Sequence, residues 1–232
     1  KRAFPSPWNS METRDGNFSL NLSMYAQIDW ILNHTESRGS TWGMETRRCR
    51  LTFAGHVIDP SWKYYVRLQY SATEAGNDTG NAEAAFIAKN FGDGWSLQAG
   101  LLFGVFSLEE DISNDEELGA DLSFVAGQFD PESVNGGCLH YQNETFRFWL
   151  TYCNGAGQVN INPLENAQQG VLFRGEYKVF GNWDDLYNFN PHPDSIEPGV
   201  LLGFGSVYNW GNYTPAPPGQ AVYGPATSLT AD

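Results

Sequence analysis

The chain has 232 residues, a formal net charge of −14 and a sequence pI near 4.5. This acidity opposes binding to nucleic acid, because such binding depends on Lys and Arg side chains that neutralise phosphates. Mean hydropathy is −0.41, and no run approaches the roughly 18 to 20 apolar residues of a spanning helix, which excludes a helical membrane protein. A membrane barrel is compatible with these values, because its strands alternate between lipid and water and average out as polar.

The composition predicts an all-β chain. It holds 25 Gly, 12 Pro and 15% aromatic residues, which favour turns and pleated strands over helices. The three cysteines, Cys49, Cys138 and Cys153, lack the CxxC spacing of metal sites and permit at most one disulfide. We expect one domain over residues 1–232, with no metal site and no cofactor.

The first predicted strand begins at Phe18. Apolar residues occupy every second position from Phe18 to Leu32, and mostly polar residues such as Asn21 and Gln27 occupy the positions between. Globular strands usually have about 5 to 6 residues, whereas a membrane strand needs about 9 to 11. The length of this strand favours a barrel.

Further alternating segments follow along the chain. The second runs from about Met44 to Val57. A tight turn at Asp59–Ser61 leads into the third, which runs from Trp62 to Ser71 and begins with Trp62 and Tyr64. Aromatic residues at a strand end are typical of the interfacial girdle of a membrane barrel. Later strands are predicted at 84–88, 95–103, 138–142, 146–152, 171–180 and 200–208, and residues 228–232 resemble the start of another.

The predicted connections alternate between long and short. Bacterial barrels show the same alternation, with short periplasmic turns and long outer loops. Gly181–Gly199 is the exception, since it is long where a short turn is expected. We also expect an outer loop over 210–228. The predicted long connections are 33–43, 73–83, 107–137 and 154–169, and the short ones are 59–61, 91–94 and 143–145.

Four segments together resemble the phosphate-selective porin O/P family: Arg47–Leu51, Gly92–Gly100, Phe106–Glu110 and Gly181–Asp184. The resemblance covers about residues 18–210. It implies a sixteen-stranded antiparallel barrel in the bacterial outer membrane, a homotrimer, and a third outer loop, residues 107–137 here, folded into the pore. About nine or ten strands would then be an incomplete portion of that barrel.

One departure from the family concerns the permeant. Where the family usually has Gln-Phe-Lys-x-Pro-Phe, this chain has Leu101–Phe106, without the lysine and the proline. Anion selection needs positive charge along the solute path. The resemblance therefore implies the architecture of the family, and it does not extend to phosphate as the substrate.

Two charged groups are the candidate functional residues. The expected loop contains seven acidic residues between Ser107 and Asp121, which indicate either an acidic constriction or a solvated outer loop, with clustered cation binding as a weaker third reading. Basic residues on the polar faces of the strands indicate either a pore-lining ladder or ordinary pairing with carboxylates such as Asp29. The acidic set is Glu109, Glu110, Asp111, Asp115, Glu116, Glu117 and Asp121, and the basic set is Arg48, Arg50, Lys63, Arg67 and Arg174.

Catalysis has little support in the sequence. The four histidines are scattered singly and no serine lies in a GxSxG context, so we expect no catalytic residues. The expected function is a passive diffusion channel for small hydrophilic solutes or ions, with the outer-membrane bilayer as its partner. The alternative is a secreted, aromatic-rich β-sandwich that binds carbohydrate.

Overall fold

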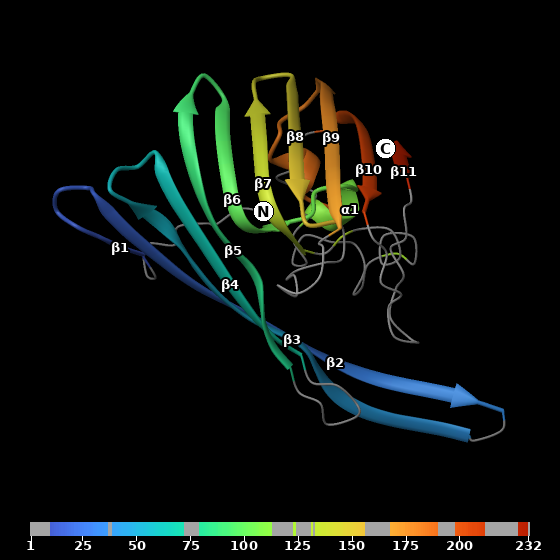
Figure 1. The fold of residues 1–232 in the computed structure, drawn as a ribbon. Coiled ribbons are helices and arrows are strands. Elements are labelled where there is room, and N and C mark those ends of the chain that lie inside the picture. Colours follow the sequence, from blue (N-terminus) through green and yellow to red (C-terminus); the bar gives the residue numbers. More distant parts are fainter. Residues whose placement is uncertain are drawn as a thin grey trace. The chain divides into compact units, whose positions relative to one another are not determined.

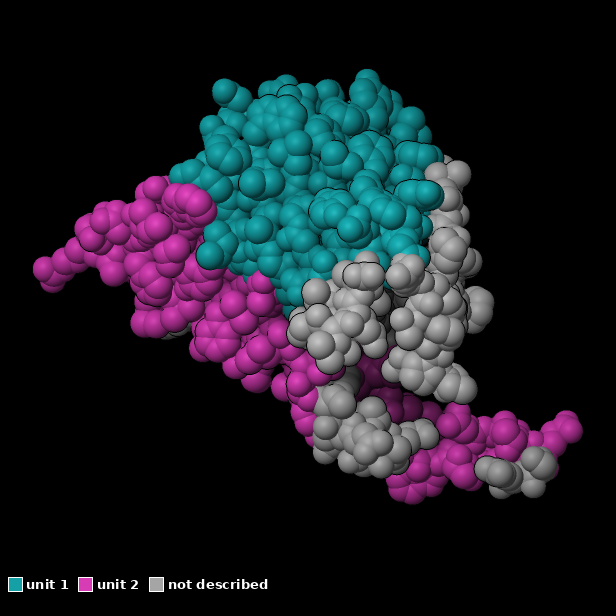
Figure 2. Space-filling model, in the orientation of Figure 1, with its two compact units in different colours: residues 1–2, 86–232 teal, residues 3–85 magenta. Residues whose placement is uncertain are grey.

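A computed structural model describes residues 10–36, 39–71, 79–112, 123, 131, 133–155, 168–189, 198–211 and 227–231. Its chain packing divides into two compact units, residues 3–85 and residues 1–2 with 86–232, drawn in magenta and teal in Figure 2. The boundary lies within strand β5 (Thr79–Gly92). Each unit is described by itself.

The unit of residues 3–85 is an antiparallel meander. Its strands are β1 (Ser10–Glu12), β2 (Phe18–Thr35), β3 (Gly39–Val57), β4 (Trp62–Ser71) and the first part of β5. The β3–β4 turn forms as predicted, because Asp59 accepts hydrogen bonds at its carboxylate from the Ser61 amide, 2.7 Å, and at its carbonyl from the Trp62 amide, 3.0 Å.

The unit that ends at residue 232 is a second antiparallel meander, in which each strand pairs with its neighbour in sequence (Figure 1). After the end of β5 it comprises β6 (Trp95–Phe103), α1 (Leu108–Asp111), β7 (Ser133–Gln142), β8 (Phe146–Cys153), β9 (Gln169–Phe180), the 3-10 turn η1 (Asp185–Tyr187), β10 (Val200–Trp210) and β11 (Thr227–Ala231). No helix in the described part is both long and apolar enough to cross a membrane.

The all-β antiparallel fold is confirmed, and two strands, β4 and β6, have the predicted bounds. The predicted long connection 33–43 is wrong, because β2 and β3 stay paired from Phe18↔Val57 to Thr35↔Gly39. The short strand β1 was not predicted. Strands β5 and β7 are longer than predicted, since they begin at Thr79 and Ser133, so residues 133–137 of the predicted loop 107–137 belong to β7.

The two faces of the strands differ in the side chains that they expose and bury. Large apolar side chains are exposed on one face of both units, among them Met24, Ile28, Leu97 and Leu202. The other face contains the buried polar residues Thr52, Arg147, Thr151, Gln168, Arg174, Glu176 and Asn209. Soluble proteins bury apolar residues and seldom expose a continuous apolar surface.

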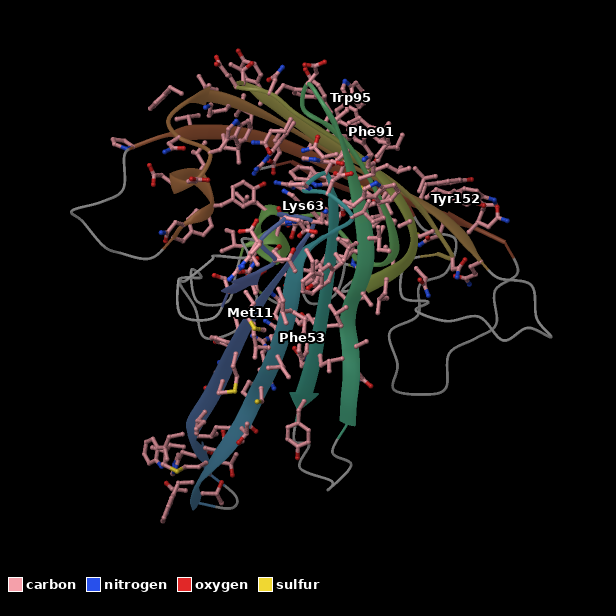
Figure 3. All side chains as sticks on the ribbon, turned by 90° about the vertical axis from the view of Figure 1, so that its left-hand side faces the viewer. Met11, Phe53, Lys63, Phe91, Trp95 and Tyr152 are labelled. Atoms are coloured by element: carbon pink, nitrogen blue, oxygen red, sulfur yellow. The ribbon has the colours of Figure 1, made fainter. Side chains whose placement is uncertain are left out.

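Aromatic residues form two bands on the exposed face of the unit that contains β6 to β11. Near the short connections, Trp95 lies 4.7 Å from Tyr141 and 5.8 Å from Phe148 between ring centroids. Toward the opposite strand ends, Trp210 lies 6.3 Å from Tyr152 and 5.6 Å from Tyr208. Phe148 and Tyr152 lie on the same face of β8, so the bands are separated by roughly 13 Å at about 3.3 Å per residue. Figure 3 labels Phe91, Trp95 and Tyr152 on this unit.

A small apolar core lies on the other face of the same unit. It consists of Leu102, Phe106, Val134, Cys138, Cys153, Leu172 and Val207. Phe106 follows the end of β6, so the chain after β6 packs against the inner face of β7 to β10. All three cysteines are free thiols.

Close backbone approach explains Gly55 in β3. A Cβ atom at this position would lie 1.9 Å from the Ser19 carbonyl oxygen on β2. Tyr64 on β4 covers the same point, and its hydroxyl donates to the Ser19 carbonyl at 3.0 Å. An aromatic side chain over a strand glycine supplies the packing that the missing side chain cannot.

We therefore expect Gly55→Ala to destabilise the protein by about 1–3 kcal/mol, because the backbone of β2 must move away from the new methyl group. Gly43→Ala is the matched control, since no atom lies within 4 Å of its Cβ position in the same strand. Urea unfolding of both variants in the same detergent, followed by tryptophan fluorescence, measures the difference. Equal midpoints would contradict the assignment.

Candidate functional site

The predicted basic ladder, Arg48, Arg50, Lys63 and Arg67, lies on one face of β3 and β4. Arg50 is the cross-strand partner of Gln69, and Arg67 is the partner of Thr52. Directly paired residues share a face, and so do residues two apart along a strand. Arg48, Arg50 and Arg67 are half-buried, whereas Lys63 is exposed at the end of β4.

Two of these arginines meet one carboxylate, that of Glu83 in β5. Arg50 Nη2 lies 2.7 Å from Glu83 Oε1, and Arg67 Nη1 lies 3.8 Å from Oε2. The Nε groups of both arginines bind neutral acceptors. Arg50 Nε donates to Gln69 at 2.7 Å, and Arg67 Nε donates to Thr52 at 3.3 Å. Side-chain exposure is 12% for each arginine and 15% for Glu83, so water screens these contacts only partly.

Sequence reasoning missed Glu83. It was placed in a loop, since the predicted strand began at Ala84, whereas β5 begins at Thr79. The available signal was that residues 81–88 contain no Gly or Pro, so the predicted strand could have been extended back over Glu83. The alternative interpretation of the basic residues, pairing with a carboxylate, therefore applies to Arg50 and Arg67, and Glu83 is the acidic partner.

A second cluster lies on β8 and β9 in the other unit. Arg174 and Glu176 are 0% and 1% exposed, and Arg147 is also buried. Arg174 Nε donates to Glu176 Oε1 at 2.7 Å, and Arg147 Nε donates to Glu176 Oε2. Arg174 was a predicted site residue, whereas Arg147 and Glu176 were not.

Aromatic rings enclose the Arg147 guanidinium. Its central carbon lies 5.0 Å from the ring centre of Trp149, 4.3 Å from that of Trp183 and 3.9 Å from that of Tyr187. Trp183 and Tyr187 belong to the β9–β10 connection, the exception to the expected loop rhythm. That connection therefore folds back over the buried face, where contacts between a cation and aromatic faces help to hold it.

Tyr187 also contacts the Glu176 carboxylate. Its hydroxyl donates to Glu176 Oε1. Burial raises the pKa of Tyr187 well above its ordinary value of 10.0, and the nearby Asp111 and Glu176 carboxylates add to this. Tyr187 thus remains protonated and keeps its hydrogen-bond donor. Arg147 Nη2 is buried and has no hydrogen-bond partner among the described residues.

The start of the expected acidic loop contacts this second cluster. Arg174 Nη1 donates to the Phe106 carbonyl at 2.8 Å, and Ile112 is buried beyond α1. Of the seven predicted acidic residues, Glu109 and Asp111 are half-buried, and Glu109 accepts hydrogen bonds from Ser123. Glu110 is described in its backbone only, and Asp115, Glu116, Glu117 and Asp121 lie outside the described residues.

The described residues contain no group of three or more His, Cys, Asp or Glu side chains that could hold a metal ion. The arrangement most similar to a catalytic pair is Ser19 with His56, 2.7 Å between Oγ and Nδ1. The other ring nitrogen of His56 contacts the Gly16 carbonyl at 2.8 Å, where a catalytic triad has a carboxylate. We assign this pair to the β1–β2 turn rather than to chemistry.

Comparison with known proteins gives one family match. The model of the family "Phosphate-selective porin O and P" matches residues 20–126, which include the ladder, Glu83 and the start of the acidic loop. No curated protein matches the sequence. The predicted resemblance is confirmed over these residues, and its later part, including Gly181–Asp184, lies beyond the match. Residues 20–126, a little less than half of the chain, are therefore similar to the phosphate-selective porin O and P family.

Proposed function

We propose that the protein is a porin of the bacterial outer membrane, through which small hydrophilic solutes and ions diffuse passively. The observation that carries the proposal is the inverted distribution of side chains. Ile28, Leu97 and Leu202 are exposed, whereas Arg174 and Glu176 are buried on the opposite face. In a barrel, lipid covers the first face and the second lines a wet lumen.

The alternative carbohydrate-binding sandwich accounts less well for this distribution. A sandwich packs the inner faces of two sheets together and fills its centre with apolar side chains. Here the buried face carries two arginines and a glutamate beside a small apolar core, and the opposite face exposes large apolar side chains. Exposed aromatic side chains toward both ends of these strands are also typical of a membrane barrel.

The proposed constriction loop is the part of residues 107–137 that precedes β7, which begins at Ser133. Its start is anchored on the polar face, since Phe106 and Ile112 are buried and the Phe106 carbonyl binds Arg174. Loops longer than about 12 to 15 residues without secondary structure are usually functional. A loop anchored at this point lies in the path of a permeating solute.

The proposed selectivity is weak and leans towards cations or neutral solutes. An anion in the constriction meets the carboxylates of the loop, and a like charge at 4 Å costs about 4 kcal/mol at an effective dielectric constant of 20. Arg50, Arg67, Arg147 and Arg174 attract anions less than free arginines would, because each contacts a glutamate. The family's homotrimer is the proposed assembly.

Cysteine labelling tests the barrel. Leu97 and Gln98 are neighbours in β6 that point to opposite faces, so we expect Gln98→Cys in lipid vesicles to react with a water-soluble maleimide and Leu97→Cys to be protected. Unsubstituted protein gives the background of Cys49, Cys138 and Cys153. The reverse pattern would exclude a lumen on this face.

Deleting Glu109 to Asp121 tests the constriction. We expect single-channel conductance in a planar bilayer to rise, because the deletion removes mass from the lumen while Phe106 and its contact with Arg174 remain. A variant with the seven acids changed to Gln or Asn keeps the loop length and separates the effect of charge from that of size. Unchanged conductance after the deletion would place the loop outside the pore.

Reversal potentials under a KCl gradient test the selectivity. We expect a small potential of the sign given by cation preference, because the loop carboxylates repel chloride. A strong anion preference that added phosphate blocks would show that the arginines control permeation, and it would contradict the proposal.

A further inference from the structure

We propose that Glu83 and Glu176 are internal counter-anions: each occupies the place between two arginines that a permeating oxyanion would otherwise take. On this view their carboxylates prevent phosphate-like anions from binding to the arginines of the pore. The inference rests on the proposed channel function and names specificity-determining residues for it.

Glu83 lies within ion-pair distance of two arginines at once. Its two oxygens contact two different arginines, Oε1 with Arg50 at 2.7 Å and Oε2 with Arg67 at 3.8 Å. The three side chains come from three strands, β5, β3 and β4, so no local sequence constraint forces them to meet. The carboxylate thus bridges two guanidinium groups, as an oxyanion would.

Glu176 repeats this arrangement in the other unit. Oε1 accepts from Arg174 Nε at 2.7 Å and Oε2 accepts from Arg147 Nε. Here again each carboxylate oxygen serves a different arginine. Two clusters at unrelated positions in the sequence therefore share one pattern, in which a single glutamate lies between two guanidinium groups.

The chemistry of the guanidinium group explains the consequence. Its planar set of N–H donors binds carboxylate and phosphate oxygens with the same geometry. A carboxylate attached to the same fold is present at a high effective concentration, which a free anion must exceed to displace it. Without that carboxylate, two partly desolvated cations face each other, and an entering oxyanion relieves their repulsion.

Glu83 is the better of the two positions for a test. It is 15% exposed, whereas Glu176 is buried and also binds Tyr187. The substitution Glu83→Gln keeps the size of the side chain and removes its charge. Glu144→Gln is the matched control, because it removes the same charge from an exposed position in the β7–β8 turn.

The experiment uses the full chain in planar bilayers, with KCl gradients and inorganic phosphate as the oxyanion probe. We expect Glu83→Gln to raise the ratio of chloride to potassium permeability about tenfold, as a change of local field in a narrow cleft does. Phosphate at millimolar concentration should then reduce the chloride current, while wild type and Glu144→Gln stay insensitive. Adding Arg67→Gln to Glu83→Gln should restore the wild-type ratio.

The outcomes separate the inference from the channel proposal. Channel currents with an unchanged permeability ratio in Glu83→Gln would overturn the inference and leave the channel standing. Wild type without currents would overturn both. If Glu83→Gln does not fold, Glu83→Asp keeps the charge but shortens its reach to Arg67, and phosphate sensitivity in that variant supports the inference, whereas insensitivity overturns it.

Discussion

The pairing of backbone groups between sequence-adjacent strands is the constraint on which the rest of the structure depends. In hydrocarbon each unpaired N–H or C=O costs several kcal/mol, so every strand must be hydrogen-bonded along its length to its neighbours. Strands β2 and β3 pair with each other over their whole length, from Phe18↔Val57 to Thr35↔Gly39. Once the pairing is fixed, the period of two fixes which side chains meet lipid and which meet the lumen.

A β-bulge in the β2–β3 pair changes which residues of β3 are exposed. Gln27 pairs with Arg48 but Ile28 pairs with Thr46, so Arg47 is the extra residue. Beyond it the faces of β3 exchange, and Trp42 and Met44 join Ile28 on the exposed side at 74% and 78% exposure. Without the bulge, Met44 would share the face of Arg48 and Arg50.

The placement of charge follows from the same constraint. A buried ion is costly unless it is paired and its remaining hydrogen-bonding groups are satisfied. Arg174 meets this condition through Glu176 and the Phe106 carbonyl. Arg147 meets it only in part, through Glu176 and three aromatic rings. The charges on this face therefore hold neighbouring segments, the β9–β10 connection and the start of the acidic loop, against the sheet.

The difference between the face of a residue, which is local, and its distant partners explains what the sequence could predict. The alternation in β4 and β6 contains no bulge, and their bounds were predicted correctly. The faces of Arg50, Arg67 and Arg174 also follow from alternation, because face is a local property. Their partners were not predicted, since Glu83 lies on another strand and Tyr187 in a connection, and pairing between distant segments is set by register and by the fold of loops.

The same reasoning bears on the relation between family and substrate. The match to phosphate-selective porins covers both Arg50 and Arg67, yet arginine alone does not make an anion site. A guanidinium group attracts a permeating anion only with donors that the protein itself has not already used. Where a glutamate from the neighbouring strand binds two such groups, the architecture and the positive residues can persist while the affinity for the anion is lost. Selectivity in the proposed pore is then a property of pairs and triads of side chains, and no count of arginines or of loop carboxylates along the sequence determines it.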